Sequence, residues 1–105
     1  MTDDTPVDGA ALIEALVAIQ ARGAIGGTPI PEAIEHALHY VRRIPADVAR
    51  LADLGSGGGL PGLVIAVHRP DLLVVLVERR ATRADLLRRA VAALGVSGRV
   101  TVLCD

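Results

Sequence analysis

The segment Leu51–Gly62, LADLGSGGGLPG, places an acidic residue and a series of glycines at the end of a short apolar run. Glycine is entropically costly in a folded chain, so a loop this rich in it needs close backbone approach or positive φ angles. An apolar strand, a glycine-rich turn and a helix in succession form the nucleotide-handling site of doubly wound parallel sheets. We therefore expect this loop to hold a nucleotide-like ligand.

Two glycine patterns overlap in this loop. The sequence G-x-G-x-x-G that begins at Gly57 matches the dinucleotide fingerprint, and Glu78 ends the next apolar run, where a ribose-binding acid is expected. The second pattern is an acid followed by alternating glycines, and it begins at Asp53. A dinucleotide needs a helix N-terminus directed at its pyrophosphate, and a carboxylate at position 53 would repel that dianion. The same carboxylate favours a cationic ligand.

The second pattern resembles motif I of class I S-adenosylmethionine-dependent methyltransferases. S-adenosylmethionine carries a cationic amino group, a sulfonium and a carboxylate, but no phosphate. The resemblance implies that Asp53 helps hold the cationic end, while the glycine amides face the carboxylate and ribose. Glu78 would bind the ribose hydroxyls under either interpretation, so Asp53 is the residue that discriminates. The simpler alternatives are a turn cap for Asp53 and a solvated strand end for Glu78.

A longer string is more specific. About residues 51 to 102 are similar to the bacterial GidB/RsmG family. The similarity is carried by the segments LADLGSGGGLPG, RPDLLVVLVER, an arginine-bearing helix and LGVSGRVTV. Members of that family methylate N7 of a guanine in small-subunit (16S) ribosomal RNA. The resemblance implies S-adenosyl-L-methionine as cofactor and 16S rRNA or the small ribosomal subunit as partner. Guanine N7 has a free lone pair and no proton to remove, so alignment suffices and no catalytic residue is expected.

Site residues follow from the same resemblance. It implies cofactor contacts by the strand-end acids and the glycine loop, namely Asp53, Gly55, Ser56, Gly57, Gly59, Leu60 and Glu78. Arg83 matches the arginine of the family's Lys-Arg pair, whereas Thr82 replaces the lysine. The family's Asp-Ser after a helix histidine, matched here by His36, appears as His39-Tyr40, and its Trp-Asn and Asn-Leu-Thr segments are absent. These departures concern the RNA substrate more than the cofactor.

RNA binding is expected from arginines that follow the second apolar run. The first candidates are Arg79, Arg80 and Arg83, and Arg88 and Arg89 extend the same expected surface. The alternative is an ordinary solvated helix face, because phosphate binding requires clustered charges. All 11 basic residues are arginine, and the net charge of −1 excludes a wholly basic nucleic-acid binder while leaving room for a local patch. His36 and His39 lack partners at zinc spacing, so no metal site is expected.

Other features suggest a cytoplasmic protein. The single Cys104 excludes an internal disulfide, and its apolar surroundings predict a buried small side chain. The N-terminal segment MTDDTPVDG is acidic, unlike a signal peptide. With 51% hydrophobic residues but one aromatic, Tyr40, the core must be aliphatic.

Periodicity predicts helices over about residues 8 to 22 and 31 to 43, separated by the flexible segment GAIGGTPIP. After them, the order strand, helix, strand, helix, strand is given by VARLADL, PGLVIAVHR, LLVVLVE, TRADLLRRAVAAL and RVTVLC. The aliphatic run LLVVLVE predicts a strand buried on both faces, and Thr82 with Asp85 predicts a capping box.

The predicted fold class is α/β: a Rossmann-like class I methyltransferase fold with a partial three-layer sandwich, a parallel sheet of order 3-2-1, and N-terminal helices that pack against the sheet. Residues 1–45 form the expected N-terminal helical segment, and residues 46–105 the first half of the cofactor-binding domain. The first strand is expected at an open edge, which favours self-association and suggests half of a longer methyltransferase. The alternatives are a non-catalytic cofactor-binding or interaction module, a small-molecule methyltransferase and an NAD-binding domain.

Overall fold

The computed structural model describes residues 8–105. These residues form four helices and three strands, in the order that the sequence predicts. Residues 1–7 of the segment MTDDTPVDG, on which the expectation of no signal peptide rests, lie outside the described residues. In chain order the elements are α1 (Gly9–Ala21), α2 (Ile30–Arg43), β1 (Arg50–Leu54), α3 (Gly62–His68), β2 (Leu73–Glu78), α4 (Ala81–Leu94) and β3 (Val100–Cys104). No helix among these residues is long and apolar enough to cross a membrane.

The three strands form one parallel sheet in the order β1-β2-β3, which is the predicted order counted from the opposite edge. Asp53 lies opposite Leu76, and Glu78 lies opposite Cys104. The carboxyl ends of all three strands therefore meet at one edge of the sheet, and the glycine loop follows β1 at that edge. The predicted α/β class and the edge position of β1 are confirmed.

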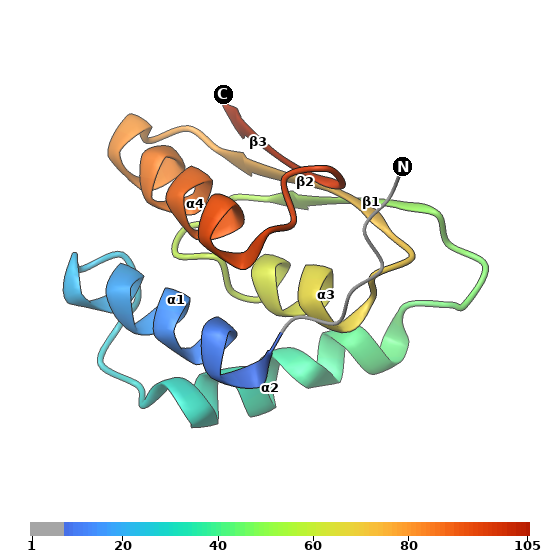
Figure 1. The fold of residues 1–105 in the computed structure, drawn as a ribbon, viewed down its shortest axis with the longest axis horizontal. Helices are drawn as coiled ribbons and strands as arrows, with labels where there is room; N and C mark the ends of the chain where they lie inside the picture. Colours follow the sequence, from blue (N-terminus) through green and yellow to red (C-terminus); the bar gives the residue numbers. More distant parts are fainter. Residues whose placement is uncertain (1–7) are drawn as a thin grey trace.

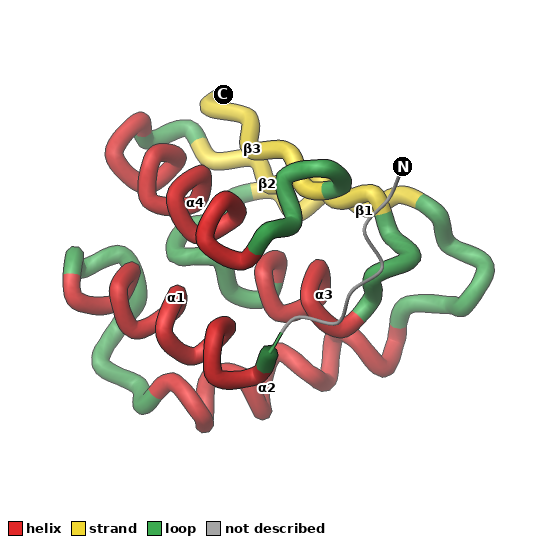
Figure 2. The backbone as a smooth tube through the Cα atoms, viewed as in Figure 1, coloured by secondary structure: helices red, strands yellow, loops and turns green. Residues whose placement is uncertain are grey.

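The helices form two layers on one face of the sheet (Figures 1 and 2). Right-handed crossovers place both α3 and α4 on the same face. α1 packs mainly on α4, and α2 packs on α3. The prediction that the N-terminal helices pack against the sheet is therefore wrong: the apolar stripe of α1, formed by Leu12, Leu16 and Ile19, is buried against other helices.

Burial in β2 alternates, although its sequence predicts a strand covered on both faces. Val74, Leu76 and Glu78 are buried, whereas Leu73 is exposed. The reason is that no described helix lies on the opposite face of the sheet. Cys104 is also exposed, because β3 is an edge strand here, so the prediction of a buried thiol is wrong.

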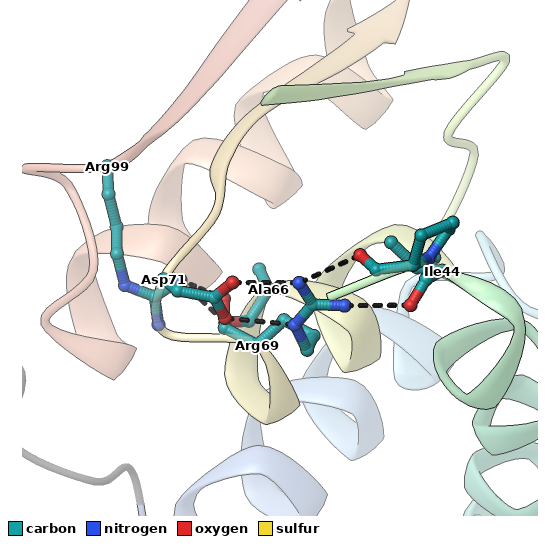
Figure 3. Close-up of polar contacts among 6 residues, drawn as sticks. Ile44, Ala66, Arg69, Asp71 and Arg99 are labelled. Carbon is teal, nitrogen blue, oxygen red and sulfur yellow. Dashed lines mark hydrogen bonds and ion pairs between the residues drawn. The ribbon is translucent and has the colours of Figure 1, made fainter. Parts of the chain in front are cut away.

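A pair of arginines fixes α3 at the edge of the sheet opposite the glycine loop (Figure 3). Arg99 is buried, and its Nη1 donates to the carbonyl oxygens of Ala66 at 2.6 Å and Arg69 at 3.4 Å, which lie at the end of α3. Arg69 in turn donates to the carbonyl oxygen of Ile44 at 3.1 Å and pairs with Asp71. These bonds satisfy carbonyl groups that a helix end leaves unpaired, and they hold in place the helix whose first turn closes the glycine loop.

Candidate functional site

The glycines of the loop serve two different purposes. Gly55 and Gly57 have positive φ angles of 73° and 54°, and an added Cβ would meet no atom closer than 3.8 Å at either position. A Cβ at Gly58 would collide with the side chain of Ile25, and one at Gly59 would lie 2.5 Å from Leu63 Cδ1. Of these four glycines, only Gly55 and Gly57 therefore leave space for a ligand. Gly59, expected at the cofactor, is buried by packing.

The loop is covered from an unexpected direction. Ala24 and Ile25 lie against Gly58, where an added Cβ would be 2.6 Å from the Ala24 carbonyl oxygen. The segment GAIGGTPIP, predicted to be a flexible break, thus packs on the loop. Periodicity in the sequence gives no signal for this contact, because it joins two irregular segments.

Asp53 lies beneath the start of α3. Its Oδ2 is buried, has no hydrogen-bond partner among the described residues, and contacts the position that a Cβ of Gly62 would occupy. Burial raises the pKa of the Asp53 carboxyl, and the nearby Ser56 hydroxyl and Gly62 amide partly oppose that rise. One oxygen of the acid is thus directed into the protein, and the expected contact with a cationic ligand group stays a prediction.

The loop amides are largely engaged within the chain. The N–H groups of Gly55 and Ser56 both donate to the Val77 carbonyl oxygen at 2.9 Å. The Gly59 N–H donates to the Ser56 carbonyl oxygen at 2.8 Å. The side chain of Ser56 is also turned inward: it is 2% exposed, and its hydroxyl donates to the Asp53 carbonyl oxygen at 2.8 Å.

This arrangement differs from the expectation that loop amides face a ligand carboxylate. No hydrogen bond to the carbonyl oxygens of Gly55 and Gly57 occurs among the described residues. The accessible part of the loop therefore offers acceptors more than donors.

Glu78 connects the loop to the end of β2. Its Oε2 accepts from the Gly57 N–H at 2.8 Å, and its Oε1 accepts from the Arg80 N–H at 3.1 Å. These two bonds, with smaller contributions from the charges of Arg83 and Arg80, lower the pKa of the Glu78 carboxyl, so it is ionised at neutral pH. A carboxylate has about four acceptor positions, which leaves capacity for two ligand hydroxyls.

The start of α4 depends on the same carboxylate. Arg80 is the N-cap residue of α4 and has no side-chain cap, so the predicted capping box of Thr82 and Asp85 is wrong. The bond from the Arg80 amide to Glu78 takes over part of that role. An acid at this position is also favourable because the N-terminus of a helix carries partial positive charge.

A basic hollow of about 460 Å³ lies beside this edge, between the end of α1 and the start of α4. Its lining includes four arginines from distant parts of the sequence, Arg22, Arg80, Arg83 and Arg89. Of the arginines expected to bind RNA, Arg80, Arg83 and Arg89 are thus brought together, whereas Arg79 and Arg88 are not among the lining residues. Arg22 had no sequence signal, because 58 positions separate it from Arg80.

Comparison with known proteins identifies relatives of one kind. A family model described as rRNA small subunit methyltransferase G (GidB) matches residues 24–105. Proteins of that name from Rubrobacter xylanophilus and from a Nocardioides species are 42% identical over 89 residues and 45% identical over 86 residues. Each alignment covers nearly four-fifths of this chain, at 79% and 78%, but 34% of the relative. The chain thus spans about a third of their length.

The fold also has a solved counterpart. The crystal structure of a Klebsiella pneumoniae protein described as an O-methyltransferase superposes with a TM-score of 0.66. It covers 93% of this chain and 44% of the counterpart, at 23% sequence identity. This likeness establishes the Rossmann-like methyltransferase fold.

Gly62→Ala tests the close approach of α3 to β1 and β2. A Cβ at position 62 would meet Asp53 Oδ2 and lie 2.5 Å from Leu76 Cδ2, so the substitution should destabilise the protein by about 1–3 kcal/mol. Urea unfolding measures this change. Gly98→Ala is the matched control, since nothing lies within 4 Å of its added Cβ. Equal stability of the two variants would contradict the packing described here.

Glu78→Gln tests the carboxylate bonds through their pH dependence. The folded pKa of Glu78 lies below its ordinary value of 4.5, so its ionisation stabilises the fold above that pH. The stabilisation is lost as pH falls through the folded pKa. Urea unfolding should show the Gln variant less stable at neutral pH, with the difference closing in acid. A difference independent of pH, or one matched by the exposed control Glu14→Gln, would refute this assignment.

Proposed function

Because the chain belongs to the GidB family of rRNA small subunit methyltransferases, we propose that it binds S-adenosylmethionine as part of a methyltransferase. The acceptor that we propose for the whole protein is N7 of a guanine in small-subunit ribosomal RNA, which would place its activity in the cytoplasm. The matched relatives that carry the rRNA methyltransferase name are longer, and the aligned segment covers 34% of each of them. The chain itself contributes the glycine loop, the strand-end acids and the basic hollow.

The observation that carries the proposal is the polarity of the open loop. Four amides of the loop donate hydrogen bonds within the chain, namely those of Gly55, Ser56, Gly57 and Gly59. The carbonyl oxygens of Gly55 and Gly57 accept no hydrogen bond from the described residues. A surface of acceptors beside two carboxylates suits a ligand whose reactive end is cationic. It suits a pyrophosphate poorly, because the amides of Gly55, Ser56 and Gly57 are already engaged and the two carboxylates would repel the dianion.

Glu78 supplies the second half of the proposed site. Its ionised carboxylate is held in place by two backbone amides and has acceptor capacity left for ribose hydroxyls. The residues present therefore fit S-adenosylmethionine, with Glu78 on the ribose and the carbonyls of Gly55 and Gly57 toward the amino group. Asp53 adds negative potential from below.

The bound cofactor would supply an electrophilic methyl group on a sulfonium. The acceptor nitrogen needs no deprotonation, so this chain's residues act by orientation alone. The loop bonds to Val77 and Glu78 keep the open carbonyls fixed, which reduces the reorganisation needed when the ligand binds.

RNA binding is supported by the basic hollow. Four arginines converge there, and the one carboxylate among the lining residues, Asp85, is paired with Arg88 at 3.3 Å. Clustered guanidinium groups are the feature that phosphate recognition requires. We therefore add Arg22 to Arg80, Arg83 and Arg89 in the proposed RNA surface.

Calorimetric titration with S-adenosylhomocysteine tests cofactor binding. The chain should bind it saturably and should bind NAD far more weakly. Glu78→Ala should reduce the affinity at least about tenfold, because the two ribose hydroxyls lose a charged acceptor worth about 1.5–3 kcal/mol. Glu14→Ala, exposed on α1, is the control. Tighter binding of NAD than of S-adenosylhomocysteine would refute the proposal.

Arg22→Gln tests the basic hollow. Binding of a short RNA, followed by fluorescence anisotropy, should weaken, and the slope of log K against log salt should fall by about one charge. Arg42→Gln, exposed on α2 and outside the hollow, should leave both quantities unchanged. If the two variants behave alike, RNA does not use this hollow.

A further inference from the structure

Tyr40 is the one aromatic residue of the Phe, Trp and Tyr class in the sequence, and it is 59% exposed. An aliphatic core would accommodate such a side chain, yet this one projects from α2 into solvent. Packing in the core therefore does not account for the position of this side chain.

Tyr40 lies between two hollows that share one wall. The first, of about 400 Å³, is bounded by α2 and the glycine loop, and its lining includes Glu32, His36, Leu60 and Pro61. The second, of about 520 Å³, extends along β1 to Asp53 and Gly55 and is also lined by Leu60 and Pro61. Both volumes lie within the range of about 300–1,000 Å³ that is usual for small-ligand sites. The second hollow thus connects Tyr40 to Gly55 of the glycine loop.

The face of α2 directed at these hollows carries charged and aromatic side chains, which can bind a polar ligand. Glu32, His36, Tyr40 and Arg43 recur at intervals of three or four residues, so they share one side of the helix. The rings of His36 and His39 meet edge to face, with centroids 6.2 Å apart. The opposite side, which includes Ile34, Leu38 and Val41, packs against the core.

From this arrangement we propose that Tyr40 is the platform on which the methyl-accepting nucleobase stacks. The proposal rests on the function proposed above and adds the position of the acceptor. Base stacking on an exposed aromatic ring is the usual means by which proteins hold an unpaired RNA base. Leu60 and Pro61 bound the base from the side of the loop, and the Glu32 carboxylate lies within the same hollow as an acceptor for base N–H groups. Glu78 lies on the β2 side of the loop, so ribose and acceptor occupy opposite sides of Gly55–Gly57.

Proton NMR tests this directly, because no other Tyr, Phe or Trp overlaps the Tyr40 ring signals. The probe is a short oligouridine strand with one central guanine, and the control strand lacks that base. The guanine strand should shift the Tyr40 ring protons upfield and saturably, and the abasic strand should not. Tyr40→Leu should weaken binding of the guanine strand about tenfold, within the range for loss of one stacked base. Tyr40→Phe should retain it.

Two controls separate this proposal from the function on which it rests. Glu35→Ala, exposed on the same helix outside both hollows, should leave RNA binding unchanged. Tyr40→Leu should leave the affinity for S-adenosylhomocysteine unchanged. If cofactor and RNA both bind but the Tyr40 ring signals and the Tyr40→Leu affinity do not respond, the stacking proposal is wrong and the proposed function stands. Binding of neither ligand would overturn both.

Discussion

The carboxylate of Glu78 is the constraint on which the rest of the site depends. It accepts one amide from the loop after β1 and one from the start of α4, so three segments are fixed by a single side chain. Because both donors are backbone groups, they cannot be supplied or withdrawn by a change of side chain. Charge-assisted bonds of this kind are stronger than neutral ones, and they lower the pKa of Glu78. The bond from the Gly57 amide, together with those from the Gly55 and Ser56 amides to Val77, gives the accessible part of the loop its acceptor character.

The sequence predicted the elements well, and physical reasons explain the exceptions. The α/β order and the edge position of β1 follow from hydrophobic periodicity, which acts locally. Burial of Cys104 and of both faces of β2 was predicted wrongly, since burial depends on which layers cover a strand. The placement of α1 on α4 failed for the same reason: an apolar stripe shows that a helix is packed, but not against what.

The site was predicted in part. Glu78 is where the sequence puts it, and Arg80 and Arg83 do converge. The roles of individual glycines could not be predicted from the sequence. Gly58, Gly59 and Gly62 are required because other residues pack closely against them, and several of these residues are distant in the sequence. The local sequence also does not mark Arg22 or Tyr40 as a binding residue, because each becomes a candidate only through the hollow that it lines in the folded chain. The direction of the loop amides depends on the folded backbone, so it cannot be predicted from the residue types of the motif.

A crystal structure of the chain with S-adenosylhomocysteine tests the central claim most directly. The account predicts the ribose hydroxyls within hydrogen-bond distance of Glu78, the ligand's amino group at the carbonyl oxygens of Gly55 or Gly57, and the Gly57 amide still bonded to Glu78. A ligand carboxylate held by loop amides that had left Val77 and Glu78 would contradict it.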